Sequence, residues 1–268
     1  WMPHYAKLAD EHLKNKYGKG LDDFFPPVIF FEGTPFELDR LMIIRVLVGV
    51  LVALLFYVGM RGAKIVPKGF QNVVEIALDF VKTYISDDII GKKDGDRFLP
   101  IIATIFFLTL FMNIPAVIPG LNISPNARIG MPLVMALVVY VVFIYAGAKK
   151  YGFFSFVGKS IVVPNLPPAL HLLVVPIEFI STFVLRPATL TIRLMANMLA
   201  GHIMIVLLFS ATNFFFWQFN GWTAVSLVTI IVAVAFTFFE LLVIFLQAYI
   251  FALLAAVYID LSLHADSH

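Results

Sequence analysis

The apolar run from residue 169 to about residue 212 constrains the fold more than any other part of the chain, because it is far longer than a lipid bilayer is thick. As one α-helix it would be about 65 Å long, against a hydrocarbon core of about 30 Å. The run must therefore tilt steeply or break into two spans. Pro176 and Pro187 are possible kinks, but a break near Arg186 would leave Arg193 in a short interfacial turn. We therefore predict one bent, tilted helix over residues 169–213.

The composition places the chain among membrane proteins. Hydrophobic residues make up 61% of the 268 positions and charged residues only 13%, which is not the composition of a soluble domain. The absence of cysteine excludes disulfides and thiolate metal sites, and a net charge of +2 gives no reason to expect a nucleic-acid partner. No cofactor or metal is expected. Trp1 rather than methionine stands first, which suggests a processed or incomplete start, and no signal-peptide pattern precedes the first long apolar run.

The remaining apolar runs predict an all-α, polytopic membrane protein with about five transmembrane helices, the last two long and steeply tilted. The expected spans are residues 41–60, 98–119, 131–148, 169–213 and 222–259, which together with an amphipathic surface helix over 68–90 form a membrane domain of residues 40–268. Residues 1–39 form a polar arm. Basic residues follow the first and third spans, as is typical of cytoplasmic ends; they are Arg61, Lys64, Lys68, Lys149 and Lys150. The arm is thus expected outside, and the tail, residues 260–268, in the cytoplasm.

The segment from Lys68 to Ile90 has polar residues on one helical face and apolar residues largely opposite. The polar residues recur at helical spacing, for example at Gln71, Glu75 and Asp79. We predict an amphipathic helix lying along a membrane surface, although a helix packed on a partner protein fits the same pattern. The proline-rich stretch 152–168 is expected to be a short connection.

Two apolar segments carry five charged or titratable groups, the composition of an ion or proton path: Glu178, Arg186, Arg193, His202 and Glu240. Arg193 is the leading candidate, because an arginine at mid-membrane depth costs about 2.5–3.5 kcal/mol to insert and does not lose its proton. At about 100° per residue, Arg186, Arg193 and Asn197 form one stripe, whereas His202 points to the opposite side. One helix thus presents polar groups in two directions.

Each of these groups also has a structural interpretation. Arg186 lies near the cytoplasmic boundary, where it can meet lipid headgroups, and Glu178 can cap a helix or pair with Arg186. His202 alone would fit a satisfied interior histidine, but Glu240 in the facing segment favours a proton-carrying pair. An unpaired buried carboxylate would neutralise, so a purely structural Glu240 is the weaker interpretation. Asn113, in the second span, fits interhelical hydrogen bonding better than a channel role, and both stay open.

The motif IRLMANMLAGH at residues 192–202, followed by Glu240 and by LQAYIF at residues 246–251, resembles the last two helices of subunit a of F-type ATP synthases. This subunit is the stator beside the rotating c-ring. The resemblance is close over the C-terminal third of the chain and elsewhere covers only the order of elements. It implies that Arg193 is the essential arginine of the family and that Asn197 and Gln247 are the polar groups beside it. It also implies that Tyr258 is the family's tyrosine that follows the glutamine farther along the last helix.

The same resemblance implies that His202 and Glu240 form a proton-carrying pair, which the family uses in either order. Ala116 is a departure, because some members carry an acidic residue at this position, three beyond the asparagine that Asn113 matches. The outer half-channel is therefore expected to depend more on Glu240 and His202. Glu178 is the weaker candidate for the inner exit, and Arg186 is a possible second basic site.

The implied function is proton translocation in a rotary ATP synthase through two offset half-channels. Arg193 favours the ionised form of a c-ring carboxyl and repels a proton that would pass straight across. The implied partners are the c-ring, the peripheral-stalk subunit b and the rest of the synthase, and the chain has no nucleotide site of its own. A bacterial plasma membrane is expected rather than an organellar inner or thylakoid membrane.

Two other functions remain open at this point. An ion-coupled secondary transporter would also use intramembrane charge, but such folds usually contain a repeated half, and none is visible here. A structural membrane scaffold would explain the long helices but not the charged groups within them. The choice between proton and sodium is not fixed by this chain, because the carboxylate site of the ring largely decides it.

Overall fold

The computed structural model describes residues 28–30, 38–61, 64, 68–118, 121, 124–161, 168–217 and 223–264. Its elements are the strands β1 (Val28–Phe30) and β2 (Leu38–Asp39), the helices α2 (Arg40–Met60), α3 (Phe70–Val81), α4 (Lys92–Asn113), α5 (Gly130–Tyr151), α6 (Phe153–Ile161), α7 (Pro168–Ile180), α8 (Arg186–Phe216) and α9 (Thr223–Leu263), the π-helices η2 (Lys82–Asp87) and η5 (Ser181–Leu185), and the 3₁₀ turns η3 (Ile114–Ala116) and η4 (Pro125–Ala127). Five helical stretches in this part of the chain are long and apolar enough to cross a membrane. The prediction of an all-α, polytopic membrane protein is confirmed, with one short antiparallel strand pair before α2.

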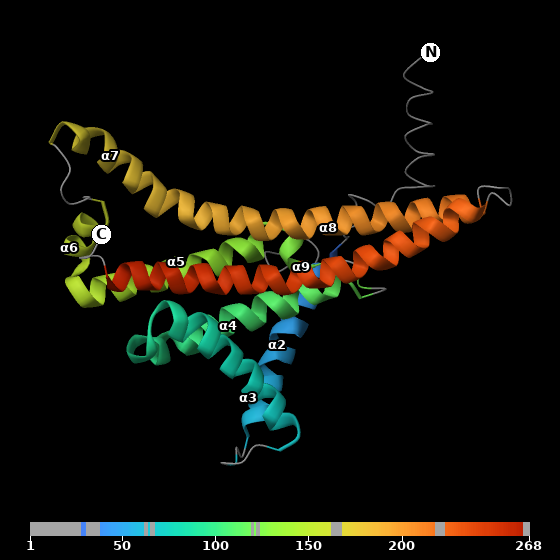
Figure 1. Ribbon diagram of the computed structural model, residues 1–268, viewed down its shortest axis with the longest axis horizontal. Coiled ribbons are helices and arrows are strands. Elements are labelled where there is room, and N and C mark those ends of the chain that lie inside the picture. The colour runs from blue at the N-terminus through green and yellow to red at the C-terminus, as the bar shows by residue number, and fades with distance from the viewer. Residues whose placement is uncertain are drawn as a thin grey trace.

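A long antiparallel hairpin of α8 and α9 dominates the molecule (Figure 1). Small residues line the face of α9 that contacts α4 and α5, so these helices pack closely on it. These residues, Ala248, Ala252, Ala255 and Ala256, are all fully buried. Figure 1 shows α2 crossing the direction of α8 and α9 steeply, with α3 at the far end of α2. If α2 is upright in a bilayer, α8 and α9 are steeply tilted.

The predicted single bent helix is confirmed. Helical structure runs without a break from α7 through η5 into α8, and its apolar part, Leu173–Phe216, is 44 residues long. The backbone N–H of Arg186 bonds to the carbonyl of Ser181, five residues earlier, just before Pro187 removes the next N–H. A π-helical turn of this kind bends a helix without ending it. Figure 1 shows α7 turning away from the body at this point.

Two membrane-spanning helices have bounds that differ from those expected from the sequence. The second span begins at Lys92, before the expected residue 98, and its α-helix ends at Asn113, since Pro115 converts the following turn to the 3₁₀ turn η3. The helix α9 continues to Leu263, past the expected residue 259, because both Ile259 and Leu263 are buried against the core.

The helix α6 lies in the stretch 152–168, where the sequence predicted only a short connection. Phe156 of α6 is fully buried and packs on α5 so closely that a Cβ at Gly147 would overlap its ring. This contact with α5 stabilises the short helix. Of the arm, residues 1–39, only 28–30 and 38–39 lie within the described residues.

The expected surface helix is formed by α3 and η2. Val74 and Val81 are buried, whereas Phe70, Val73 and Ile76 are exposed at 50–61%. This apolar outer face fits a lipid surface and a partner protein equally well, so its environment stays a prediction.

Candidate functional site

Polar side chains meet along the interface between α8 and α9. The Nδ2 of Asn197 donates a 2.7 Å hydrogen bond to Oε1 of Gln247, and Thr212 bonds to Thr229 at 3.0 Å farther along the hairpin. Gln247 is 2% exposed, and its Nε2 has no hydrogen-bond partner among the described residues. The hairpin thus brings together the two amides that the sequence placed in separate segments.

His202 and Glu240 are both buried in the same interface, about one and a half turns along α8 from Asn197 and about two turns along α9 from Gln247. The Glu240 carboxyl packs on the backbone of Gly201, where an added Cβ would overlap Oε1 and lie 2.5 Å from Oε2. Glu240 Oε1 has no hydrogen-bond partner among the described residues. Gly201, next to His202 in the chain, therefore leaves room for a buried carboxyl in the interface.

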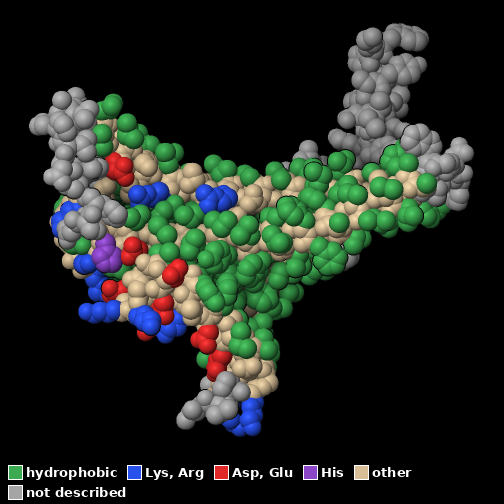
Figure 2. Space-filling view, in the orientation of Figure 1, with side chains coloured by type: hydrophobic (Ala, Val, Ile, Leu, Met, Phe, Trp, Pro, Cys, Tyr) green, Lys and Arg blue, Asp and Glu red, His purple; other side chains and the backbone are tan. Residues whose placement is uncertain are grey.

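Arg193 lies on the side of α8 opposite His202 and about 40° around the helix axis from Asn197. It is exposed, and it makes no hydrogen bond or ion pair with any other residue that the structure describes. Its exposed neighbours on this face are mostly small or apolar and include Ile192, Ala196 and Ala200. Arg186 and Arg193 are the only lysine or arginine residues of α8, and Figure 2 shows blue patches on this side of the molecule. The polar groups of α8 therefore point in two directions, toward α9 and away from the molecule.

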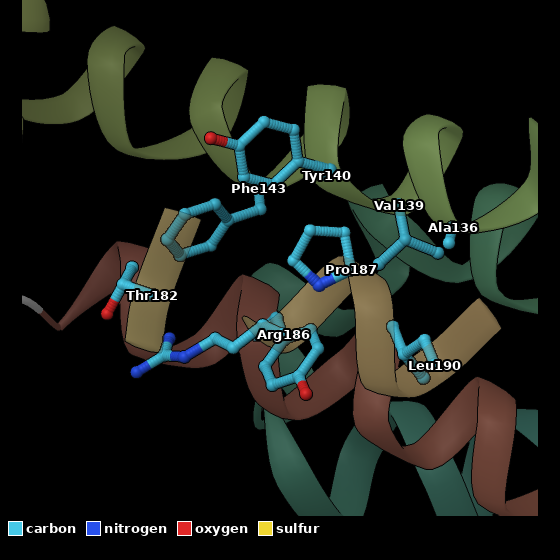
Figure 3. A pocket seen from close by; sticks show the side chains of 9 residues that line it. Ala136, Val139, Tyr140, Phe143, Thr182, Arg186, Pro187 and Leu190 are labelled. Carbon is cyan, nitrogen blue, oxygen red and sulfur yellow. The ribbon is translucent and has the colours of Figure 1, made fainter. Parts of the chain in front are cut away.

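Arg186 lies at the start of α8, between α5 and α9 (Figure 3). Its guanidinium lies 3.8 Å from Oε1 of Glu178, 5.4 Å from the ring centre of Tyr258 and 6.0 Å from that of Phe143. Arg186, Tyr258 and Phe143 line, with neighbouring side chains, a cavity of about 10 Å³, close to the lower limit for one water molecule. The structure thus shows the pairing of Glu178 with Arg186, and Thr182 donates a further bond of 3.2 Å to Glu178.

The π-helix η5 explains how Glu178 and Arg186 meet. Residues eight apart on an α-helix are offset by about 80° around the axis. The wider turn of the π-helix between them absorbs this offset and places both side chains on one face.

Comparison with known proteins places this arrangement in a family. The family model described as ATP synthase A chain matches residues 42–260, which is most of the chain. A protein of Rhodococcus erythropolis named ATP synthase subunit a is 62% identical over 253 residues, which cover 94% of this chain and 92% of that protein. Proteins of the same name from Paenarthrobacter aurescens and Frankia alni are 38% identical over 251 residues and 37% identical over 232 residues, covering 93% and 86% of this chain and 94% and 79% of theirs.

This chain belongs to the ATP synthase A chain family. The resemblance seen in the motif at residues 192–202 is therefore confirmed, and it extends over nearly the whole chain. As a member of the ATP synthase A chain family, it is an integral membrane component of a larger complex and not a catalyst by itself. The similar proteins quoted above are all bacterial.

Asn113 lies apart from the other candidate site residues, which are in α7, α8 and α9. It is fully buried at the end of α4, where its Oδ1 accepts bonds from Asn126 Nδ2 at 2.7 Å and from Ser124 Oγ at 3.2 Å. Ala116, one turn beyond, is buried and apolar. Asn113 thus joins α4 to the turn η4 by hydrogen bonds.

Ser124 and Asn126 were not singled out from the sequence. Their only signal was a turn rich in proline, glycine and asparagine, a composition typical of any exposed loop. Their burial, at 1% and 0% exposed, shows that residues 124–127 fold into the protein.

Proposed function

We propose that this chain is the proton-translocating stator subunit of an F-type ATP synthase, and that Arg193 faces carboxylates of a rotating c-ring. The observation that carries the proposal is an exposed arginine, without an ion pair or hydrogen bond to any described residue, on a membrane helix. A guanidinium facing lipid at mid-membrane depth costs about 2.5–3.5 kcal/mol or more, so it needs a partner of opposite charge from another chain. A carboxylate that moves past it meets this need.

The uncovered face of α8 supports the same partner. In Figure 1 no described element covers the side of α8 that faces away from α9 and α5. Ala196 and Ala200, one and two turns after Arg193, are exposed on it and allow the backbone of another helix to approach closely. We assign this face to the c-ring. Family membership supports subunit b and the rest of the synthase as the other partners.

The proposed mechanism follows from the positions of polar side chains on two sides of α8. His202 and Glu240, inside the hairpin, take up protons from the outer side, and Asn197 and Gln247 lie next to them toward Arg193. A ring carboxyl gives up its proton where Arg193 stabilises its charged form. The same fixed charge repels a proton that would pass directly between the half-channels, so transport requires rotation. Each charge that crosses supplies about 2.3 kcal/mol per 100 mV.

The inner exit is assigned to the region of Glu178, Arg186 and Tyr258. Glu178, in α7, is half-buried and hydrogen-bonded to Thr182, and it pairs with Arg186 at the start of α8. Basic residues at the end of α5 support a cytoplasmic location for this end, with the N-terminal arm outside, in a bacterial plasma membrane.

Replacement of Arg193 in the assembled synthase tests the proposal. Arg193→Ala is expected to abolish ATP-driven acidification of inverted membrane vesicles while the subunit still assembles. Ile192→Ala, which shortens the neighbouring exposed side chain and leaves the charge in place, is the matched control and is expected to pump normally. Retained pumping by Arg193→Ala would overturn the proposal.

A further inference from the structure

The short helix α6 presents two aromatic side chains to its surroundings. Phe154 is 89% exposed and Phe153 is 54% exposed, whereas Phe156 is fully buried. At about 100° per residue, Phe154 points almost directly away from the face on which Phe156 packs against α5. The outer face of α6 is therefore apolar, and no described residue covers it.

Three lysines stand beside this outer face, and we call Lys149, Lys150 and Lys159 the basic rim. The first two end α5, the third lies in the last turn of α6, and all are exposed. The ammonium groups of Lys159 and Lys150 lie 4.2 Å and 5.3 Å from the ring centre of Tyr151, and that of Lys149 lies 5.6 Å from the ring centre of Tyr145. Figure 2 shows Lys and Arg side chains at the end of the molecule where Figure 1 places α6.

The basic rim lies in a part of the chain without acidic residues. No aspartate or glutamate occurs between Asp96 and Glu178. Neither Lys149 nor Lys150 forms an ion pair with a described residue, and Glu178 pairs with Arg186. The charge of the rim therefore complements an anionic partner from outside the chain.

The basic rim also continues an exposed apolar stripe of α5. Four residues at helical spacing are 47–63% exposed along this stripe, and they are Val134, Val138, Val141 and Tyr145. Lys149 follows one turn after Tyr145. An exposed apolar stripe on a membrane-spanning helix fits acyl chains, whereas tyrosine and lysine at its end fit the headgroup region. A phospholipid matches both parts of this surface.

We propose that the outer face of α6 and the basic rim bind anionic phospholipids, with Phe153 and Phe154 among the acyl chains and the lysines at the phosphate groups. Short amphipathic helices with aromatic and basic faces lie in the membrane interface in this way. The inference goes beyond the proposed function, because it requires only a chain that crosses the membrane. The proposed orientation adds that the lipids belong to the cytoplasmic leaflet.

A fluorescent label on α6 tests whether its outer face contacts lipid. The chain has no cysteine of its own, so Phe154→Cys and Ser155→Cys each add one site for an environment-sensitive label in the assembled synthase. The unsubstituted synthase gives the background from other subunits. Ser155 is the matched control, because it is the next residue, is also exposed and lies on the side of α6 that carries Lys159.

The labelled synthase is reconstituted in phosphatidylcholine bilayers with or without acyl chains that carry a nitroxide quencher. We expect the nitroxide to quench the label on Phe154→Cys and aqueous iodide to quench the label on Ser155→Cys. Equal quenching of the two labels by the nitroxide would overturn the proposal. A label on Phe154→Cys that neither quencher reaches would also overturn it, because a protein would then cover α6.

The preference for anionic lipid is tested with two nitroxide lipids that differ only in headgroup. Each is added in the same small amount, one with phosphatidylglycerol and one with phosphatidylcholine. We expect phosphatidylglycerol to be enriched about fivefold or more at the label on Phe154→Cys, which corresponds to about 1 kcal/mol from a lysine near the surface. This enrichment should fall in 1 M salt, where the screening length is only about 3 Å. Equal quenching by the two headgroups would refute the preference.

Removal of lysine charge locates the preference on the basic rim. We expect Lys149→Gln/Lys159→Gln to lose most of the enrichment, while Lys150 is left unchanged because its ammonium bonds to the Leu263 carbonyl. The matched control is Lys64→Gln/Lys68→Gln, which removes the same charge before α3, away from α6 (Figure 1). Equal enrichment in the two double variants would refute the role of the rim. If Lys149→Gln/Lys159→Gln does not assemble, the salt dependence decides, and enrichment that persists in 1 M salt would count against the rim.

The two proposals fail in different ways. Pumping by Arg193→Ala would refute the proposed function even if the label on Phe154→Cys contacts lipid. A label on Phe154→Cys that lies in water, together with loss of pumping in Arg193→Ala, would refute only the lipid surface.

Discussion

The contact between Gly201 and Glu240 leads to a sharp prediction, because a single methyl group there changes the site without changing any charge. In Gly201→Ala the new Cβ would overlap Glu240 Oε1 and lie 2.5 Å from Oε2. Ordinary contact needs about 3.5 Å, so Oε2 must move by about 1 Å and Oε1 by more. Since the obstructing atoms are the end of a flexible side chain, we expect the carboxyl to swing aside and the helices to stay together.

The expected effects on stability and on transport differ in size. Overpacking lowers the free energy of unfolding by about 1–3 kcal/mol, and we expect the lower end here. Replacing glycine by alanine inside a helix raises it by about 1 kcal/mol. The net change in the free energy of unfolding is therefore close to zero. Misplacement of a reacting group by about 1 Å can slow a reaction by as much as about a hundredfold. We expect ATP-driven proton pumping to fall by at least about tenfold, which corresponds to 1.4 kcal/mol.

The assay is acidification of inverted vesicles that contain the complete synthase, followed together with thermal stability of the purified complex. Gly49→Ala is the matched control, because Gly49 is also inside a helix and a Cβ there meets nothing within 4 Å. In Gly201→Ala, a second change of Glu240→Asp withdraws the carboxyl by one methylene and should restore part of the pumping. If Gly201→Ala pumps as well as Gly49→Ala, the position of the Glu240 carboxyl does not limit transport, and the reasoning is refuted.

Three further predictions concern contacts that hold the site in place, each measured as a shift in the thermal unfolding of the purified complex. Asn197→Leu removes the 2.7 Å bond to Gln247 and leaves a buried amide unsatisfied, so we expect a loss of about 1–3 kcal/mol; no shift would mean that the bond is not formed. Gly147→Ala forces a methyl group into the ring of Phe156 and should cost about 1–3 kcal/mol, whereas unchanged protease resistance of α6 would contradict the contact. Asp39→Ala removes the side-chain acceptor for an N–H in the first turn of α2 and the ion pair with Arg128, so it should cost about 1 kcal/mol or more, while Asp39→Asn, which loses the ion pair but keeps an acceptor, should lose less.

Much of the fold follows from the sequence through hydrophobic length and the cost of intramembrane charge. Apolar runs of about 20 residues predict membrane spans wherever they occur. A run twice as long, with Arg193 inside it, predicts one bent helix, because a break would have to place that arginine at the surface. The family could also be inferred from one segment, since the spacing of Arg193, Asn197 and His202 is specific.

Contacts between distant segments had to come from the tertiary structure. Helical periodicity separates Arg193 from His202 around one axis, but only the register of α8 against α9 shows that Asn197 meets Gln247 and that Gly201 receives the Glu240 carboxyl. No local pattern predicts η5, since a π-turn depends on packing around it, yet this turn aligns Glu178 with Arg186.

The amino-acid sequence by itself determined that this chain crosses a membrane about five times and carries a permanent charge within it, because the solvation costs of apolar and charged side chains are properties of each residue. Only the tertiary structure decided which groups that charge does and does not meet. It also turned an ordinary loop composition into the buried cluster of Asn113 and Asn126, because hydrogen-bond satisfaction in a folded interior depends on positions far apart in the chain.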